Sequence, residues 1–207
     1  NIAANQGHLK AAKSYFDEAI EIDPTHVRAR LNRASIHMAS GNAQDALDDA
    51  NVLLELAPGL ALAKLRRAEA NMMLTNWEAA KDDLEVIIED APHHHHALTQ
   101  LAACYISMDR PEKAEAPLNE ALRLAPDHTD AWHQRGLLYL DWGREEAALN
   151  DFEAAVRCDG SHLDARLHIA AIHHEAKRFV EASGAWKGVL AIEPDHAVAR
   201  RRKEECE

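Results

Sequence analysis

The chain has 207 residues, of which 47% are hydrophobic but only 5% are aromatic, and its formal net charge is -12 from 35 acidic and 23 basic residues. An acidic surface repels phosphate groups, so this charge argues against unspecific binding to nucleic acid or to anionic membranes. The sequence contains no apolar run of the roughly 18 residues that a membrane-spanning helix needs, and its widely spaced cysteines do not indicate a disulfide framework.

The first segment, residues 1–26, is interpreted as a partial repeat. Asn1 to Ala4 match the last turn of a helix, and Gly7 is predicted to turn the chain into a second helix over residues 8–22. Because a natural domain rarely begins half-way through a helical hairpin, we expect the sequence to be a piece of a longer chain.

Five predicted helix pairs follow, each closed by a break that recurs every 34 residues. Proline and glycine both end helices, and they occupy this position as Pro24, Pro58, Pro92, Pro126, Gly160 and Pro194. The predicted pairs span residues 27–40 and 43–56, 61–74 and 77–90, 97–108 and 112–124, 129–142 and 145–158, and 163–176 and 179–192. The corresponding repeats are residues 27–60, 61–94, 95–128, 129–162 and 163–196.

Two segments depart from the regular pattern. Pro117 lies inside the predicted helix 112–124, where its missing N–H should kink the helix or loosen its first turns, whereas Pro111 lies in the first turn, where proline is tolerated. Residues 197–207 begin like another helix, but Lys203 and Glu204 occupy positions that a further helix would need to be apolar and small. We interpret this last segment as a polar capping helix.

Small side chains recur on the same 34-residue grid. The three positions hold Ala12, Ala46, Ala80, Ala114, Ala148 and Ala182; Ala29, Ala63, Ala97, Ala131, Ala165 and Ala199; and Ala34, Ala68, Ala102, Gly136 and Ala170. A fourth, bulkier position holds Phe16, Ala50, Leu84, Leu118, Phe152 and Trp186. Such columns predict that helix backbones approach closely at the small residues.

Residues 129–162 carry the fullest form of the pattern, with Trp132, Gly136, Tyr139, Ala148 and Phe152 at characteristic spacings. Arg135 stands where leucine is usual, and Gly160 stands in place of proline. This unit resembles the tetratricopeptide repeat (TPR), a helix-turn-helix of 34 residues. The resemblance implies one continuous all-α, right-handed superhelical solenoid of antiparallel helix pairs.

No residue pattern predicts catalysis or a cofactor, because the sequence lacks a nucleotide-binding glycine loop and the HExxH, CxxC and GxSxG motifs. The run from His93 to His96 suggests metal affinity, but four successive side chains point in different directions and a metal site needs converging ligands, so we predict no functional metal site.

Cys158 shares its column with Ile22, Leu56, Leu124 and Ile192 and is expected to be buried. His37 and His173 are expected to pack between helices.

The resemblance further implies that the first helix of each pair lines a groove that binds a peptide or helix of a partner protein. In the N-terminal half the groove positions are Arg28, Leu31, Asn32, Ser35, Met38, Leu62, Leu65, Arg66, Glu69, Met72 and Met73. They continue as His96, Thr99, Gln100, Ala103, Ile106, Asp130, His133, Gln134, Leu137, Leu140, Asp164, Leu167, His168, Ala171 and His174. Because methionine adapts to apolar partners, the preferred anchor patch is Leu31, Met38, Leu62, Leu65, Met72 and Met73, with packing between repeats as the rival role for each methionine.

A more specific function is disfavoured by the residues at the groove positions. TPR proteins that bind the C-terminal carboxylate of chaperones use lysine, asparagine and arginine, whereas the matching positions here are Leu31, Ser35, Arg66, His96 and Gln100. We therefore predict a non-enzymatic, cytoplasmic scaffold that binds a protein segment, with neither nucleic-acid binding nor membrane insertion. The alternative is a targeting or regulatory region of a larger enzyme, such as a glycosyltransferase, or of a multi-subunit complex.

Overall fold

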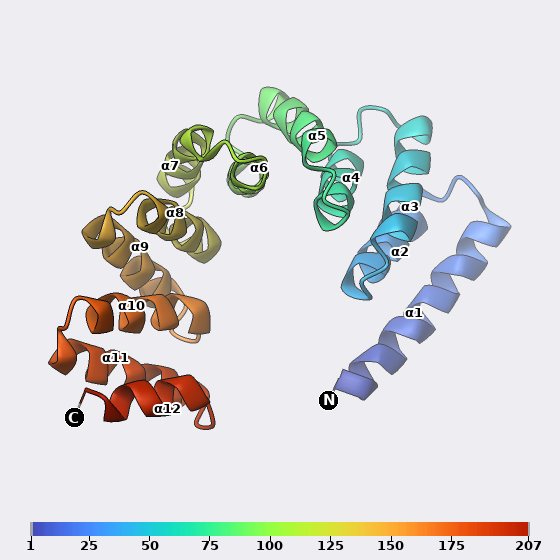
Figure 1. Cartoon of the computed structure of the whole chain (residues 1–207). Helices are drawn as coiled ribbons and strands as arrows, with labels where there is room; N and C mark the ends of the chain where they lie inside the picture. Colours follow the sequence, from blue (N-terminus) through green and yellow to red (C-terminus); the bar gives the residue numbers. More distant parts are fainter. Residues whose placement is uncertain (1, 207) are drawn as a thin grey trace. The chain divides into compact units, whose positions relative to one another are not determined.

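The structure, a computed structural model, describes the backbone of residues 2–206 and the side chains of residues 8–206. Within that range the chain is helical and contains no strand (Figure 1). The chain divides into two compact units, Asn1–Arg110 and Pro111–Glu207. Unit 1 contains α1 (Ile2–Ile22), α2 (Val27–Ala39), α3 (Ala43–Leu56), α4 (Ala61–Met73), α5 (Trp77–Asp90) and α6 (His95–Ser107). Unit 2 contains the 3-10 helix η1 (Pro111–Lys113), α7 (Glu115–Leu124), α8 (Thr129–Asp141), α9 (Glu145–Cys158), α10 (Leu163–Glu175), α11 (Phe179–Ile192) and α12 (Ala197–Glu204).

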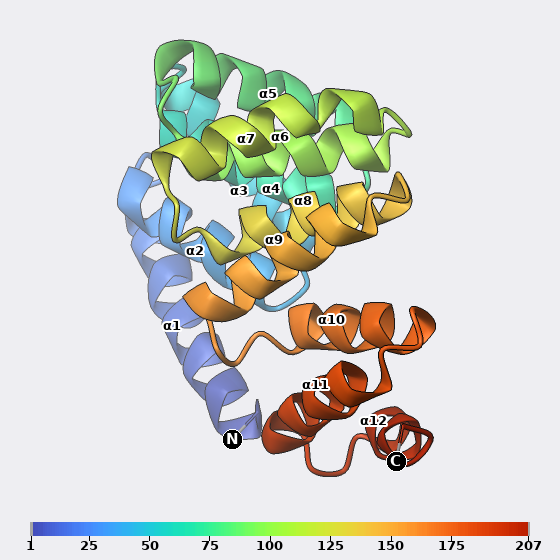
Figure 2. The same ribbon diagram turned by 90° about the vertical axis from the view of Figure 1, so that its left-hand side faces the viewer.

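Packing inside each unit is local along the chain. Every α-helix of unit 1 contacts the next one, and the same holds from α7 to α12 in unit 2. Figure 2 shows α8 to α12 following one another in this way. The all-α class and the helix pairs are confirmed, whereas the limits of the individual repeats stay a prediction.

The turn between the two helices of a pair uses a left-handed backbone residue at one grid position. The φ angles at this position are 77° at Gly41, 61° at Thr75, 59° at Asp109, 68° at Gly143 and 57° at Lys177. At the first of these turns the N–H of Gly41 donates to the Met38 carbonyl at 3.0 Å, and the N–H of Asn42 donates to the His37 carbonyl at 2.8 Å, which closes the helix end. The three residues with side chains are exposed there, so only the intrinsic backbone cost of about 1–2 kcal/mol opposes them.

The beginnings of two helices test the predictions made from glycine and proline. The turn predicted at Gly7 is wrong, because α1 runs as one helix from Ile2 to Ile22. The loosening predicted around Pro117 is confirmed, because α7 begins only at Glu115 and a 3-10 turn precedes it. Pro117 therefore lies in the first turn of α7, where no helical hydrogen bond from its nitrogen is needed.

Small residues do allow close packing, most tightly at Gly136. A Cβ at this position would lie 2.7 Å from Cε1 of Phe152, which is fully buried. The equivalent position in α4 is Ala68, and there the residue 16 places later is Leu84 rather than phenylalanine. The larger ring in α9 thus occupies the volume that an alanine methyl group takes in the earlier repeat.

Gly136→Ala is expected to destabilise unit 2 by about 1–3 kcal/mol, because it overpacks the core against Phe152. Urea denaturation measures the change in the free energy of unfolding. Gly184→Ala in α11 is the matched control: nothing lies within 4 Å of its added Cβ, so it should instead stabilise by about 0.5–1 kcal/mol. The double variant Gly136→Ala/Phe152→Leu recreates the Ala68 and Leu84 combination and should recover stability. Equal stability of Gly136→Ala and the parent protein would contradict the packing argument.

A repeated buried ion pair joins the two helices of several pairs. Arg33 Nε donates to Asp49 at 2.8 Å, and the equivalent bonds link Arg67 to Asp83 at 2.8 Å and Arg135 to Asp151 at 2.7 Å. The three aspartates are buried, and the hydrogen bonds that their carboxylates accept raise the pKa values of the arginines. In the remaining two repeats the same positions hold Leu101 with Pro117 and Ile169 with Ala185. Each repeat therefore has both the arginine and the aspartate, or neither of them.

The cysteine and histidine predictions have mixed outcomes. Cys158 is exposed, so its predicted burial is wrong; the column it shares also leaves Ile22 79% exposed and Leu56 42% exposed. Leu124 and Ile192 of the same column are half-buried, so this position in the last turn of the second helix is never fully covered among the described residues. His37 is buried and His173 is half-buried, as packing between helices requires.

Candidate partner-binding face

The first helices of the pairs in unit 1, α2 and α4, carry the accessible part of the predicted anchor patch. Leu62 is 42% exposed and Met73 is 46% exposed, and both belong to α4. Leu31 and Met38 of α2 are half-buried, while the polar residue Asn32 on the same helix is exposed. These apolar side chains remain available at the surface of unit 1, which is the property that a partner-binding face needs.

Two members of the predicted patch belong instead to the core. Leu65 is only 8% exposed and packs in a cluster with Leu84 and Leu101, and Met72 packs against that cluster. Packing between repeats therefore applies to Met72, while Met73 lies at the surface. Within the described residues, the accessible patch consists of Leu31, Met38, Leu62 and Met73. We call these four residues the apolar patch.

The polar groove residues of α4 and α6 bond to one another. Glu69 forms an ion pair with Arg66, accepts a hydrogen bond from Gln100 Nε2 at 3.3 Å and lies 3.6 Å from His96 Nε2. Burial by itself would raise the pKa of Glu69, but the hydrogen bonds from His96, Arg66 and Gln100 outweigh it, and the pKa is lowered. Arg66 Nε and Gln100 Oε1 are buried without a hydrogen-bond partner within the described part of the chain.

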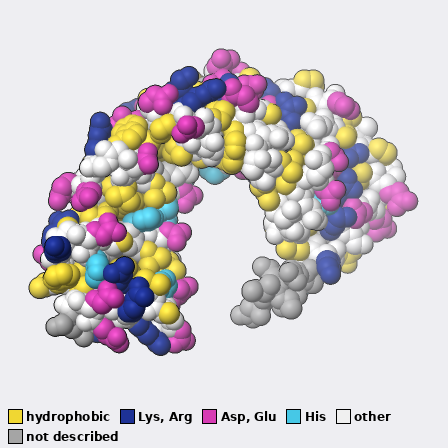
Figure 3. Space-filling model, viewed as in Figure 1, with side chains coloured by type: hydrophobic (Ala, Val, Ile, Leu, Met, Phe, Trp, Pro, Cys, Tyr) yellow, Lys and Arg dark blue, Asp and Glu magenta, His cyan; other side chains and the backbone are white. Residues whose placement is uncertain are grey.

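The first helices of unit 2 bring predicted residues together around a histidine cluster. The His133 ring of α8 lies 4.7 Å from His162 and 5.7 Å from His168 of α10, measured between ring centroids, and His168 stacks on Phe152 at 4.8 Å. Burial, followed by repulsion from His162 and His168, lowers the pKa of His133 to about 4, and burial lowers the pKa of His168. Figure 3 shows histidine side chains at the surface of this unit.

Two further predicted residues, both in α8, lie beside this cluster in the sequence. Leu137 is 37% exposed, and Gln134 is half-buried, with its Oε1 buried and lacking a partner among the described residues. The first helices of unit 2 therefore offer neutral imidazoles and one accessible leucine, whereas those of unit 1 offer the apolar patch and a polar network.

Comparison with known families agrees with the repeat period. Models described as "Tetratricopeptide repeat" match residues 1–61, 62–94 and 101–167. The chain belongs to the tetratricopeptide repeat family. Membership supports a general role as a protein-interaction scaffold, because stacked repeats present extended binding surfaces. No curated protein matches this TPR chain.

Solved structures similar to this TPR chain include YrrB, described as a TPR protein with an unusual peptide-binding site. That structure has a TM-score of 0.64 and 23% sequence identity, and the match covers 91% of this chain and 97% of YrrB. A thermophilic TPR protein of Thermus thermophilus has a TM-score of 0.70 and 20% identity over 87% of this chain and 98% of that one. A chain of the APC/C hetero-tetramer Cut9-Hcn1 has a TM-score of 0.82 and 18% identity over 97% of this chain but only 40% of its own length. At these identities the likeness concerns the fold alone.

His162 belongs to the histidine cluster of unit 2, and the sequence predictions missed it. It caps α10, because its Nδ1 accepts a hydrogen bond from the Ala165 N–H at 3.2 Å. The same bond recurs from Ala29 to His26, from Ala97 to His94 and from Ala199 to His196. Histidine at positions 26, 94, 128, 162 and 196 follows the 34-residue period, and that recurrence is the sequence signal that could have identified His162.

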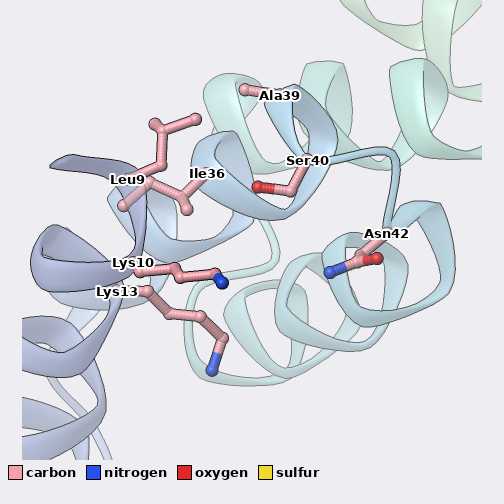
Figure 4. Close-up of a pocket in the computed structure, with 7 residues that line it drawn as sticks. All are labelled: Leu9, Lys10, Lys13, Ile36, Ala39, Ser40 and Asn42. Carbon is pink, nitrogen blue, oxygen red and sulfur yellow. The ribbon is translucent and has the colours of Figure 1, made fainter. Parts of the chain in front are cut away.

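A separate pocket lies between α1 and α2, and no predicted site residue lines it. Figure 4 shows Lys10 and Lys13 of α1 extending toward the side of Ser40 and Asn42, while Leu9 lies near Ile36. The Lys13 ammonium group is already paired with Asp17 at 2.8 Å.

Among the described residues, no three His, Cys, Asp or Glu side chains are grouped to hold a metal ion, and no helix has the length and apolar character to cross a membrane.

Proposed function

We propose that the chain is a non-catalytic scaffold that binds an extended peptide or a helix of a partner protein on the first helices of its TPR helix pairs. The accessible apolar patch on α2 and α4 is the observation that carries this proposal. Leu62 and Met73 lie at opposite ends of α4, and each exposes more than two fifths of its surface. Anchor residues of a bound segment would bury these side chains and displace water from them.

The polar network of α4 and α6 also favours partner binding, because its side chains are already ordered. The Arg66, Glu69 and Gln100 side chains are held in fixed positions by their mutual bonds, so they lose little conformational freedom when a partner binds. The only buried thiol in the described chain, Cys104, has a pKa raised to about 11 by burial, which makes it a poor nucleophile at neutral pH. Cys104 of α6 is therefore not a nucleophile for this face.

A targeting or regulatory role within a larger protein or complex is the second candidate. One observation favours it: the chain matches only 40% of its counterpart in the Cut9-Hcn1 structure, with a TM-score of 0.82. The same apolar patch would then bind another subunit. The full reading frame of the gene distinguishes the two candidates, because a catalytic domain in the same polypeptide would favour the regulatory role.

Leu62→Glu together with Met73→Glu is expected to weaken partner binding by at least about tenfold, because both substitutions place a charge in the apolar patch. Peptides selected from a random peptide library on the parent protein serve as probes, and fluorescence anisotropy measures their affinities. Circular dichroism should show unchanged helicity, since both positions are at the surface.

The matched control is Leu56→Glu together with Val86→Glu. These residues are 42% and 39% exposed, but they lie on the second helices α3 and α5 of the same unit. The control should bind the selected peptides as the parent does. If the patch variant binds as well as the parent, or if the control loses affinity to the same degree, then the proposed face is not the binding site.

A further inference from the structure

Cys206, which follows the C-cap residue of α12, lies against His174 of α10. The Sγ atom is 3.3 Å from His174 Nδ1, and the thiol is partly exposed. The His174 side chain is 16% exposed, and the Phe179 ring meets the imidazole edge-on at 6.0 Å. The thiol and the imidazole therefore form a pair of fixed orientation, separate from the apolar patch and the polar network of unit 1.

The hydrogen-bond partners of His174 define which atom donates in this pair. Arg202 Nη1 lies 3.1 Å from His174 Nε2, and a guanidinium can only donate. Nε2 must then accept, so the proton of the neutral ring is assigned to Nδ1, which donates to the sulfur. Arg202 Nη1 also donates to the Glu205 carboxylate at 2.9 Å, and this carboxylate lies 3.6 Å from His174 Nε2.

The other two cysteines lack this arrangement. Cys158 is exposed, but its hydrogen-bond partner is the Pro126 carbonyl at 3.8 Å, which accepts from the thiol. Cys104 is buried, and burial raises the pKa of its thiol. A sulfur that accepts a hydrogen bond is better prepared to react as a thiolate than one that donates.

We propose that Cys206 is a reactive thiol that takes hydrogen peroxide as its substrate, with His174 as the residue that positions and activates it. The Cys206 thiolate attacks one peroxide oxygen, an S–O bond forms and the O–O bond breaks. The sulfur is oxidised by two electrons to a sulfenic acid, and the leaving hydroxide takes up a proton to become water. His174 stabilises the thiolate through Nδ1–H and is not consumed.

The test treats the 207-residue chain with hydrogen peroxide, traps sulfenic acid with dimedone and measures the adduct at each cysteine by peptide mass spectrometry. Cys206 is expected to react about threefold or more faster than Cys158, which serves as the exposed reference within the same molecule. Equal rates at Cys206 and Cys158 would overturn the proposal.

Two variants separate activation from simple exposure. His174→Phe keeps an aromatic ring but removes the N–H, so the rate at Cys206 should fall to that of Cys158 while the rate at Cys158 stays unchanged. Reaction at the buried Cys104 would show that His174→Phe has unfolded the protein. In that case the deciding variant is Arg202→Gln, which removes the guanidinium that fixes the His174 tautomer and leaves the imidazole itself unchanged. An undiminished rate at Cys206 in the folded variant would show that His174 does not activate the thiol.

Discussion

Asp151→Ala is expected to lower the free energy of unfolding of unit 2 by about 3–5 kcal/mol, because it leaves a half-buried guanidinium without its carboxylate. The Asp151 side chain is only 5% exposed and that of Arg135 is 17% exposed. Two hydrogen bonds of 2.7 and 2.8 Å join them, so α8 and α9 are linked through one bidentate pair. Urea denaturation followed by circular dichroism measures the loss.

The chain itself supplies the controls for this prediction. Arg135→Ile/Asp151→Ala reproduces the Ile169 and Ala185 combination of the next repeat and should recover most of the lost stability, since removing both charges leaves neither one buried and unpaired. Asp195→Ala breaks an ion pair whose aspartate side chain is 97% exposed, and it should change stability by less than about 1 kcal/mol. A double variant as unstable as Asp151→Ala would show that the pair itself, rather than the unpaired charge, determines the stability.

Lowering the pH from 7 to 4 is expected to destabilise unit 2 by about 1–3 kcal/mol through His133, with solvent screening of its half-buried ring setting the lower figure. Burial, and then His162 and His168, lower the pKa of His133 from 6.5 to about 4, against the weaker opposing influence of Asp164 and Asp130. Between these two values the unfolded chain binds a proton that the folded chain does not. The stability contributed by the neutral ring is therefore complete above pH 6.5, declines as the pH falls, and levels off below pH 4.

The measurement compares urea denaturation of the parent protein and of His133→Gln at several values of pH. Carboxylates titrate in both proteins, so the difference between the two curves isolates the contribution of His133. The variant should lose less stability than the parent between pH 7 and pH 4. A His133 ring that titrates near its ordinary pKa of 6.5 in an NMR experiment would refute this explanation.

Local sequence rules determined the helices and their order. Residues 43–56 and 77–90 were predicted with the bounds that α3 and α5 have in the structure. The effect of Pro117 on the start of α7 was also predictable, because a missing N–H acts on the residue's own helix. The 34-residue recurrence extended these local rules to the whole chain, since repeated units of the same sequence pattern fold in the same way.

The tertiary structure decided which members of a shared helix face remain accessible. Met72 and Met73 are sequence neighbours whose side chains point about 100° apart around α4, and the core cluster covers only the side that carries Met72. The same reason explains the exposure of Cys158. Periodicity identifies residues that share a helix face, but their burial depends on how closely the neighbouring helices approach. The pairing of Asp151 with Arg135 likewise required the side-chain geometry of two packed helices.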